Sequence, residues 1–505
     1  MRKWLPLLAV CLGTFMLLID VTIVNVALPS MAKDLSTSFS SLQWVVDAYA
    51  LFLAALVLGT GSIADIVGHR QAYVAGLALF AVASFCCGIA PNAGVLIAAR
   101  AVQGLGGAAM FATTFALLNS NYSGRDRGTA YGMWGAVVSA AAAVGPIIGG
   151  LLTEGISWRW IFFVNLPISL AAIAMSVFVL KDVHESRHVR VDWYGIVTFT
   201  GAAAAVTYAM IHGNEHGWSN AGTWPFWIVG AALFVAFVQV ERHSPAAMLD
   251  LGLMRNKSFV GILLAALLLT FAAFALFTYT SIWLQSIVGL SPIKAGLIGL
   301  PLTVASFTVS AAIGRHLVRM RPGPIIAAGL VLIGVGNLIG AALVHGSASW
   351  PALLPGFFVS GLGVGMATPT LSSAGMAAVP IQRGGMAAGA VNTARQLGFA
   401  FGIALLGTVF SARVASALST RHVPKSDNVA HAVSGGQATH ILAAAPGNLR
   451  STLDSAFHHA GVAGVQTTLL VAGIVGVIAG AATFALVRSP APQPHPAPEP
   501  ASAAA

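Results

Sequence analysis

Four charged side chains lie inside long apolar segments of the 505-residue sequence: Asp20, Asp47, Arg100 and Arg395. An ionised side chain at the centre of a bilayer costs roughly 2.5–3.5 kcal/mol even on insertion scales, so residues of this kind are functional by default. A carboxylate in that position can take up and release protons, and a guanidinium can serve as its counter-ion. The four residues therefore predict a protein driven by protons.

Depth within the apolar segments suggests which of these charges meet. At a rise of about 1.5 Å per residue, Asp47 and Arg100 lie roughly 8–10 Å below one boundary and Asp20 about 13–14 Å below it. We expect Asp20 to pair with Arg100, and these two to share a proton-coupling cavity with Asp47. The alternatives are a static ion pair that only locks two helices and, for Asp47, a solvated carboxylate near a helix end. For Arg395, packing or hydrogen bonding is favoured over substrate contact.

The composition defines the class of protein that must position these groups. Hydrophobic residues make up 57% of the chain and charged residues 8%, and the mean hydropathy is +0.84. These values predict an all-α polytopic membrane protein. The net charge of +10 does not indicate nucleic acid here, because Lys and Arg concentrate in alternate loops. The three cysteines lie in apolar runs, so neither a disulfide framework nor a metal site is expected.

The apolar runs are long enough for fourteen transmembrane helices of about 20 residues each. We expect them near residues 5–29, 42–64, 72–90, 94–118, 129–152, 160–180, 193–211, 224–240, 259–286, 296–313, 324–344, 351–373, 385–412 and 461–487. Most of the 25 Lys and Arg residues fall in the loops of one side, which places both termini in the cytoplasm. The first run is too long for a signal peptide and is expected to be an uncleaved helix.

Two groups of glycines mark close helix approaches. The loop Gly61-Ser-Ile-Ala-Asp65-Ile-Val-Gly68-His-Arg70 allows a turn, with Asp65 as the expected cap of the next helix and Arg70 as a cytoplasmic anchor. A later helix carries the small-residue face Gly145, Pro146, Gly149 and Gly150, where the proline bends or loosens the helix. Simple packing explains either group taken alone.

In this order the motifs resemble the major facilitator superfamily, in particular its fourteen-helix drug:proton antiporter branch. The similarity covers residues 5–488. Its further elements are Ile19-Asp20-Val-Thr-Ile-Val-Asn25-Val-Ala-Leu-Pro29, Gln43-Trp44-Val-Val-Asp47-Ala-Tyr49, Arg100-Ala-Val-Gln103-Gly104-Leu-Gly106-Gly107, Ser157-Trp-Arg-Trp160, Asn165-Leu-Pro167, Trp283-Leu-Gln285, Ala295-Gly296 and Asn392-Thr-Ala-Arg395-Gln396. The loop motif departs from the family pattern at Ile66 and His69. The small-residue face with Gly145 and Pro146 resembles a motif that the family associates with antiporters, and it departs from that motif at Ala141. Only part of the branch has an acid at the position of Asp47.

The resemblance implies two six-helix bundles with pseudo-two-fold symmetry and an inserted helix pair. The expected divisions are residues 1–190 for the first bundle, 191–250 for the inserted pair, 251–488 for the second bundle and 489–505 for a disordered cytoplasmic tail. The second bundle includes a long outer loop at 414–460, which has room for a short hairpin or helix. In this sequence it contains no intramembrane acid, so proton coupling should depend mainly on the first bundle.

The resulting hypothesis is a proton-driven antiporter that exports lipophilic, cationic drugs or antibiotics across the inner membrane of a bacterium. Its expected substrate-binding residues are Asp20, Asp47, Tyr49, Trp283 and Asn392, and its expected gating or structural residues are Gly61, Asp65, Gly68, Arg70, Gly145, Pro146, Gly149, Gly150 and Arg395. The alternative is a dedicated exporter of an endogenous antibiotic or siderophore. We expect no enzyme activity, no cofactor, a monomer in the lipid bilayer, and a small-molecule substrate with protons as partners; a periplasmic adaptor is left open.

Overall fold

The computed structural model describes residues 2–487, except 36, 38, 182–190, 217, 219, 245–246, 248, 315, 317–319, 347–348, 380–383, 422 and 425. Across the described residues the chain is helical and contains no strand. Eleven helices in this part are long and apolar enough to cross a membrane. The expected all-α, polytopic architecture is confirmed at that level, while the expected tail at 489–505 lies outside the described residues.

The first group of helices contains most of the predicted proton-coupling residues. It consists of α1 (Leu5–Asp34), α2 (Phe39–Val67), α3 (His69–Gly88), α4 (Ala93–Asn121), α5 (Gly124–Gly155), the short α6 (Trp160–Phe163) and α7 (Asn165–Val179). Within the group α1 packs against α5 and α7, and α4 packs against α2 and α3. Two further helices, α8 (Trp193–His216) and α9 (Trp224–His243), pack on each other, and α8 packs on α2.

The second group follows in the chain. It consists of α10 (Lys257–Thr270), α11 (Leu276–Ile282), α12 (Pro292–Ile298), α13 (Leu300–Gly314), α14 (Pro322–Leu343), α15 (Leu354–Ala377), α16 (Gly384–Ser419), α17 (Ser426–Ser434), α18 (Ala438–Ala444) and α19 (Gly447–Leu486). Short 3₁₀ turns lie at Arg2–Trp4, Leu251–Arg255 and Trp350–Leu353. Here α14 packs between α15 and α19, and α10 packs on α16.

The two groups meet along α5 and α13 and along α2, α4 and α16. Glycine makes the α5–α13 contact possible. A Cβ atom at Gly132 would lie 2.5 Å from the backbone oxygen of Ser310 and 2.6 Å from the Cα atom of Gly314. Neither neighbour is a flexible side-chain end, so a larger residue at this position would force the helices apart.

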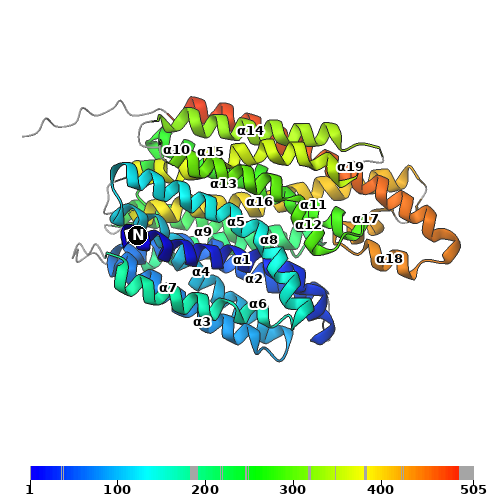
Figure 1. The fold of residues 1–505 in the computed structure, drawn as a ribbon, viewed down its shortest axis with the longest axis horizontal. Helices are drawn as coiled ribbons and strands as arrows, with labels where there is room; N and C mark the ends of the chain where they lie inside the picture. The colour runs from blue at the N-terminus through cyan, green and yellow to red at the C-terminus, as the bar shows by residue number, and fades with distance from the viewer. Residues whose placement is uncertain are drawn as a thin grey trace, which may run out of the picture.

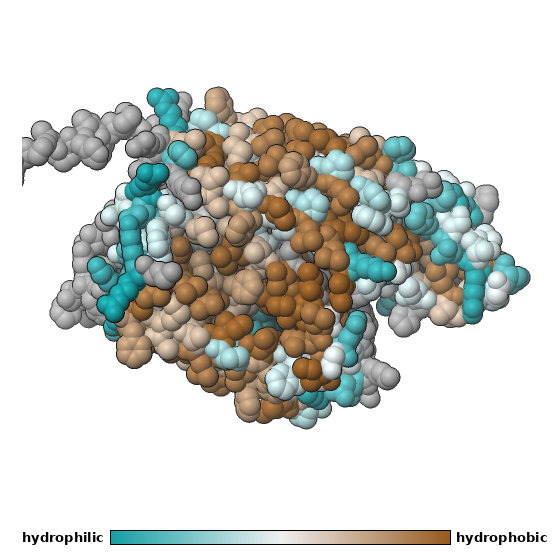
Figure 2. Space-filling view, viewed as in Figure 1, coloured by the Kyte–Doolittle hydropathy of each residue, from teal (hydrophilic) through white to brown (hydrophobic). Residues whose placement is uncertain are grey.

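The molecule has two distinct ends (Figure 1). The beginning of α1 and the end of α19 lie at one end, here called the terminal end, and α17 and α18 lie at the opposite end, the loop end. Figure 2 shows apolar side chains across the middle of one face and polar side chains gathered towards both ends. This distribution suits a protein whose middle section contacts hydrocarbon.

Two π-helical segments interrupt the span from Lys257 to Ile287, at Phe271–Ala275 and Trp283–Ile287. Such bulges leave backbone groups without their usual partner, and side chains compensate. The amide of Asn337 donates to the carbonyl oxygen of Ala272 at 2.8 Å. The second group is therefore held partly by side chains that satisfy irregular backbone.

The outer segment predicted as a loop at 414–460 is largely helical. Helix α16 continues to Ser419 and α19 begins at Gly447, and α17 and α18 lie between them, beyond the rest of the bundle (Figure 1). The extension is held together by an apolar interior that includes Val414, Val433 and Phe457, all at most 1% exposed. Burial of these apolar side chains stabilises helices in a segment whose polar composition predicted a loop.

Candidate functional site

Asp20 and Arg100 form a completely buried ion pair between α1 and α4. Both side chains have 0% exposure, and Nη1 of Arg100 donates to Oδ2 of Asp20. The predicted pairing is confirmed. A buried ion pair has a large desolvation cost, which further hydrogen bonds to its donors and acceptors offset in part.

The second oxygen of Asp20 is satisfied by two amides. Oδ1 accepts from Nε2 of Gln103 at 2.9 Å and from Nδ2 of Asn165 at 3.0 Å. The same two amides donate to Oγ of Ser84, at 2.7 and 3.3 Å respectively. We call Asp20, Arg100, Gln103, Asn165 and Ser84 the acid network; it joins α1, α3, α4 and α7 around one carboxylate.

Arg100 is fixed from α2 as well. Its Nε donates to the carbonyl oxygen of Val45 at 2.9 Å, its Nη1 also donates to Oε1 of Gln103 at 2.8 Å, and its guanidinium lies 4.2 Å from the ring centroid of Tyr49. Tyr49, a predicted substrate contact, thus covers the guanidinium face through a cation–π interaction. Asp47 lies between Val45 and Tyr49 on α2 and is half-buried. The described hydrogen bonds of the acid network do not include it.

The glycine-rich loop motif forms a contact that the sequence did not predict. Oδ2 of Asp65 accepts from the backbone N–H of Met386 at 2.9 Å, so Asp65 caps the first turn of α16 in the second group. That Asp65 also caps the next helix, α3, stays a prediction; the N-cap residue of α3 is Gly68, with φ of 103°. His69 lies 3.4 Å from Asp65, where the family pattern has arginine.

The other residues of this motif have simpler environments. Helix α2 runs through Val67, so Gly61 is helical and does not form the expected turn. Nη1 of Arg70 lies 3.4 Å from the carbonyl oxygen of Leu180, which holds the start of α3 to the end of α7. Asp65 is thus the residue of the motif that links the two groups at the terminal end.

The small-residue face of α5 packs in two directions. Gly145 and Gly149 lie against Thr22 and Ile23 of α1, whereas Gly150 lies against Ile293 of α12 in the second group. The side chain of Pro146 is outside the described part of the structure. The face therefore serves packing within the first group and contact with the second.

A narrow crevice, here called the central space, leaves no room for a water molecule. It is lined by Thr14, Leu17, Met110, Phe111 and Thr114 of α1 and α4. Asn392 of α16 reaches this region, since its Nδ2 donates to the carbonyl oxygen of Phe111 at 3.0 Å. Nε1 of Trp134 donates to Oγ1 of Thr14 at 3.1 Å, which brings α5 to the same place.

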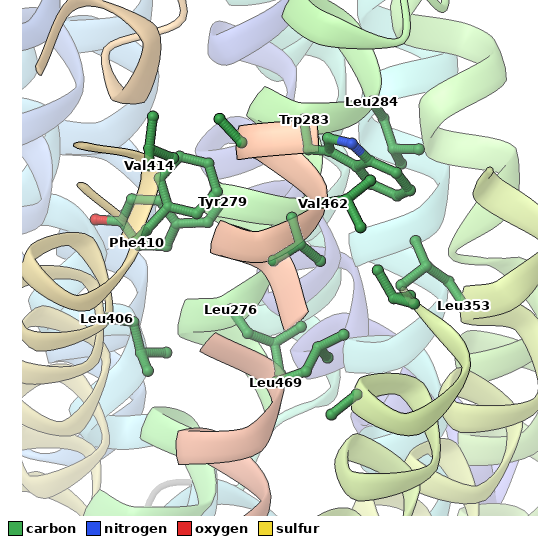
Figure 3. Close-up of a cluster of buried hydrophobic side chains, with 14 of the residues drawn as sticks. Leu276, Tyr279, Trp283, Leu284, Leu353, Leu406, Phe410, Val414, Val462 and Leu469 are labelled. Atoms are coloured by element: carbon green, nitrogen blue, oxygen red, sulfur yellow. The ribbon is translucent and has the colours of Figure 1, made fainter. Parts of the chain in front are cut away.

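The structure places Trp283 away from that space. Its side chain is fully buried in the core of the second group, and Figure 3 shows it beside Leu284 and Val462. Of the predicted site residues, Asp20, Arg100 and Tyr49 lie together, Asn392 and Arg395 lie one turn apart on α16, and Trp283 belongs to neither set. Ser84 was missed, because one serine in an apolar run gives no distinguishing signal.

Long apolar helices in two contacting groups, with charged side chains enclosed among them, are the architecture of a polytopic membrane transporter. The chain belongs to the Major Facilitator Superfamily, whose family model matches residues 10–403. It is a multi-pass membrane protein of a transporter family found in bacteria.

Named relatives agree with the drug-transporting branch of that family. The chain is 34% identical to Multidrug resistance protein Stp of Mycobacterium tuberculosis, over 82% of this chain and 77% of that protein. It is 35% identical to a puromycin resistance protein of Streptomyces alboniger, over 83% of this chain and 84% of that protein. The human organic anion transporter MFSD10 has a similar fold, with a TM-score of 0.62 at 13% identity over 95% and 99% of the two chains.

Proposed function

We propose that the protein is a proton-driven antiporter that exports lipophilic drugs or antibiotics across the cytoplasmic membrane of a bacterium. The observation that carries this proposal is a carboxylate, Asp20, buried at 0% exposure and bound by three N–H donors from two other helices. A carboxylate kept in that position at such cost suits reversible protonation. The drug and antibiotic resistance relatives support the substrate class.

The acid network links protonation to helix packing. Oδ1 of Asp20 accepts two hydrogen bonds and Oδ2 accepts one, so the site left for a proton is on Oδ2, the oxygen that faces Arg100. Protonation then weakens the hold of Asp20 on Arg100, and release of the proton restores it. Because the network joins α1, α3, α4 and α7, exchange of one proton alters the way in which four helices are held together. Asp47 is the proposed second proton site.

The contact between Asp65 and the first turn of α16 is the proposed gate at the terminal end. It crosses from the first group to the second, as does the close approach of Gly389 to Leu58. Opening this end requires the hydrogen bond from Met386 to break. A carboxylate that caps a helix contributes about 1 kcal/mol, which is small enough to be reversible.

The finer topology is part of the same proposal. Each of the fourteen expected spans coincides with a helix or an interrupted helix, although α5, α8 and the shorter α13 are not among the eleven candidate spans. An even number of spans would put both termini on one side of the membrane, and the distribution of Lys and Arg supports the cytoplasmic side for the terminal end. The proposed divisions are residues 1–190, 191–250 and 251–488, in a monomer without a cofactor.

Export of a cationic dye from proteoliposomes under an imposed pH gradient tests the function. We expect Asp20→Asn to reduce proton-dependent export to the level of protein-free vesicles, and Asp47→Asn to reduce it substantially. Asp34→Asn is the matched control, because Asp34 lies in the same group but pairs with Arg159 at a half-exposed position. Export at wild-type, pH-dependent rates in both test variants would refute the proposed coupling.

A further inference from the structure

Arg395 differs from Arg100 in having only neutral partners. It lies on α16, where Nη2 donates to Oγ of Ser372 at 2.9 Å and to the carbonyl oxygen of Thr368 at 3.3 Å. Its Nε is buried and has no acceptor among the described residues. The guanidinium is therefore held in place without being neutralised.

The helices of the second group from α10 to α16 have no acid with which to neutralise it. The sequence contains neither Asp nor Glu from residue 251 to residue 426. Within the described chain no carboxylate from either group forms an ion pair with Arg395. A cation that protein shields from water raises the free energy of the fold unless a counter-ion lies nearby. The sequence around Arg395 contains no acid that would account for an arginine at this position.

The surroundings of Arg395 are aromatic and lie beside the central space. Its guanidinium is 5.6 Å from the ring centroid of Trp134 and 5.7 Å from that of Phe115, both in the first group. Trp134 donates to Thr14, which lines the central space, and Asn392, one turn before Arg395, bonds to Phe111 of the same lining. Oδ1 of Asn392 is buried without a partner among the described residues.

We propose that Arg395 binds the ionised acidic group of the exported compound, with Trp134 and Phe115 against its aromatic part. A carboxylate or phenolate would supply the counter-ion that the chain lacks, and it would accept from the free Nε–H. The inference rests on the proposed transport function and names one class of its substrates, aromatic compounds with an acidic group, zwitterions included. A purely cationic compound gains nothing from this arginine.

Three probes of similar size test the charge preference: 2-naphthoate, its methyl ester and 2-naphthylmethylammonium. Binding to purified protein in lipid nanodiscs is followed by quenching of tryptophan fluorescence. We expect wild-type protein to bind naphthoate more tightly than the other two. Arg395→Gln should weaken naphthoate binding by about tenfold or more relative to the ester, because a hydrogen bond to a charged group is lost.

Two further variants separate charge from packing. Arg395→Lys keeps the charge and should retain most of the preference for naphthoate, while Ser372→Ala removes a support of the guanidinium and should weaken it only slightly. Unchanged naphthoate binding in Arg395→Gln, equal losses for all three probes, or no naphthoate binding to wild-type protein would overturn the inference. Failure of the proposed proton coupling would appear in a different experiment, as dye export at wild-type, pH-dependent rates in Asp20→Asn and Asp47→Asn.

Discussion

The arginines in the helices of the two groups, Arg100 and Arg395, have opposite surroundings. Arg100 in the first group faces the carboxylate of Asp20, two amides complete the carboxylate's hydrogen bonding, and a tyrosine ring covers the guanidinium. Arg395 in the second group has a hydroxyl, a backbone oxygen and two aromatic rings, but no acid. A charge that an acid of the chain neutralises suits internal proton exchange, and a charge that no acid neutralises suits recognition of a compound from outside the chain.

The largest expected effect tests this contrast directly. Arg100→Leu should lower the free energy of unfolding by about 3–5 kcal/mol, because it leaves the carboxylate of Asp20 buried and uncompensated. Arg395→Leu should cost only about 1–2 kcal/mol, since it removes two hydrogen bonds and strands no carboxylate. Unfolding titrations with SDS in mixed micelles measure both.

A double variant checks the cause of the larger loss. Adding Asp20→Asn to Arg100→Leu removes the stranded charge and should restore a substantial part of the lost stability. Equal losses in the two single variants, or no recovery in the double variant, would contradict the contrast between the two arginines.

The next largest expected effect is the coupling energy between Asn165 and Asp20, which tests whether the amide of Asn165 stabilises the carboxylate. Asn165 donates to Asp20 from α7, and a hydrogen bond to a charged group contributes about 1.5–3 kcal/mol. A double-mutant cycle with Asn165→Leu and Asp20→Asn should give a coupling energy in that range. Asn121→Leu is a matched control, because its amide bonds backbone and serine oxygens outside the acid network; coupling to Asp20 from this control would count against a specific role.

The sequence predicted a contact correctly where the charges of two side chains and their depths in the membrane both favoured pairing. Asp20 and Arg100 were predicted to pair because both are charged, lie at similar depth and belong to one bundle, and the structure confirms the pair. The contact of Asp65 with Met386 could not be foreseen, because it joins residues 321 positions apart through a backbone N–H that carries no side-chain signal. Trp283 was a reasonable aromatic candidate, but only tertiary packing shows that it faces the core.

A smaller effect is expected where the two groups touch. Gly132→Val should lower stability by about 1–3 kcal/mol and slow export, because the added atoms meet the backbone of α13. Gly155→Val at the end of the same helix is the control, since a Cβ atom there meets nothing within 4 Å. Similar losses in the two variants would mean that helix propensity, not contact between the groups, governs the effect.

The smallest expected effect on stability concerns Tyr122, at the terminal end of the first group. Its hydroxyl group, like the carboxylate of Asp20, is hydrogen-bonded within that group. Its hydroxyl accepts from the N–H of Leu7 at 2.9 Å and donates to the carbonyl oxygen of Lys3 at 3.1 Å, so Tyr122→Phe should cost about 1 kcal/mol at neutral pH. Burial raises the pKa of Tyr122 from 10.0 to about 12. Between these values the folded protein holds a proton that the unfolded chain has released, so stability falls as pH rises through this window. The difference in stability between wild type and Tyr122→Phe should therefore shrink between pH 10 and pH 12, and a constant difference would show that the hydroxyl is not buried as described.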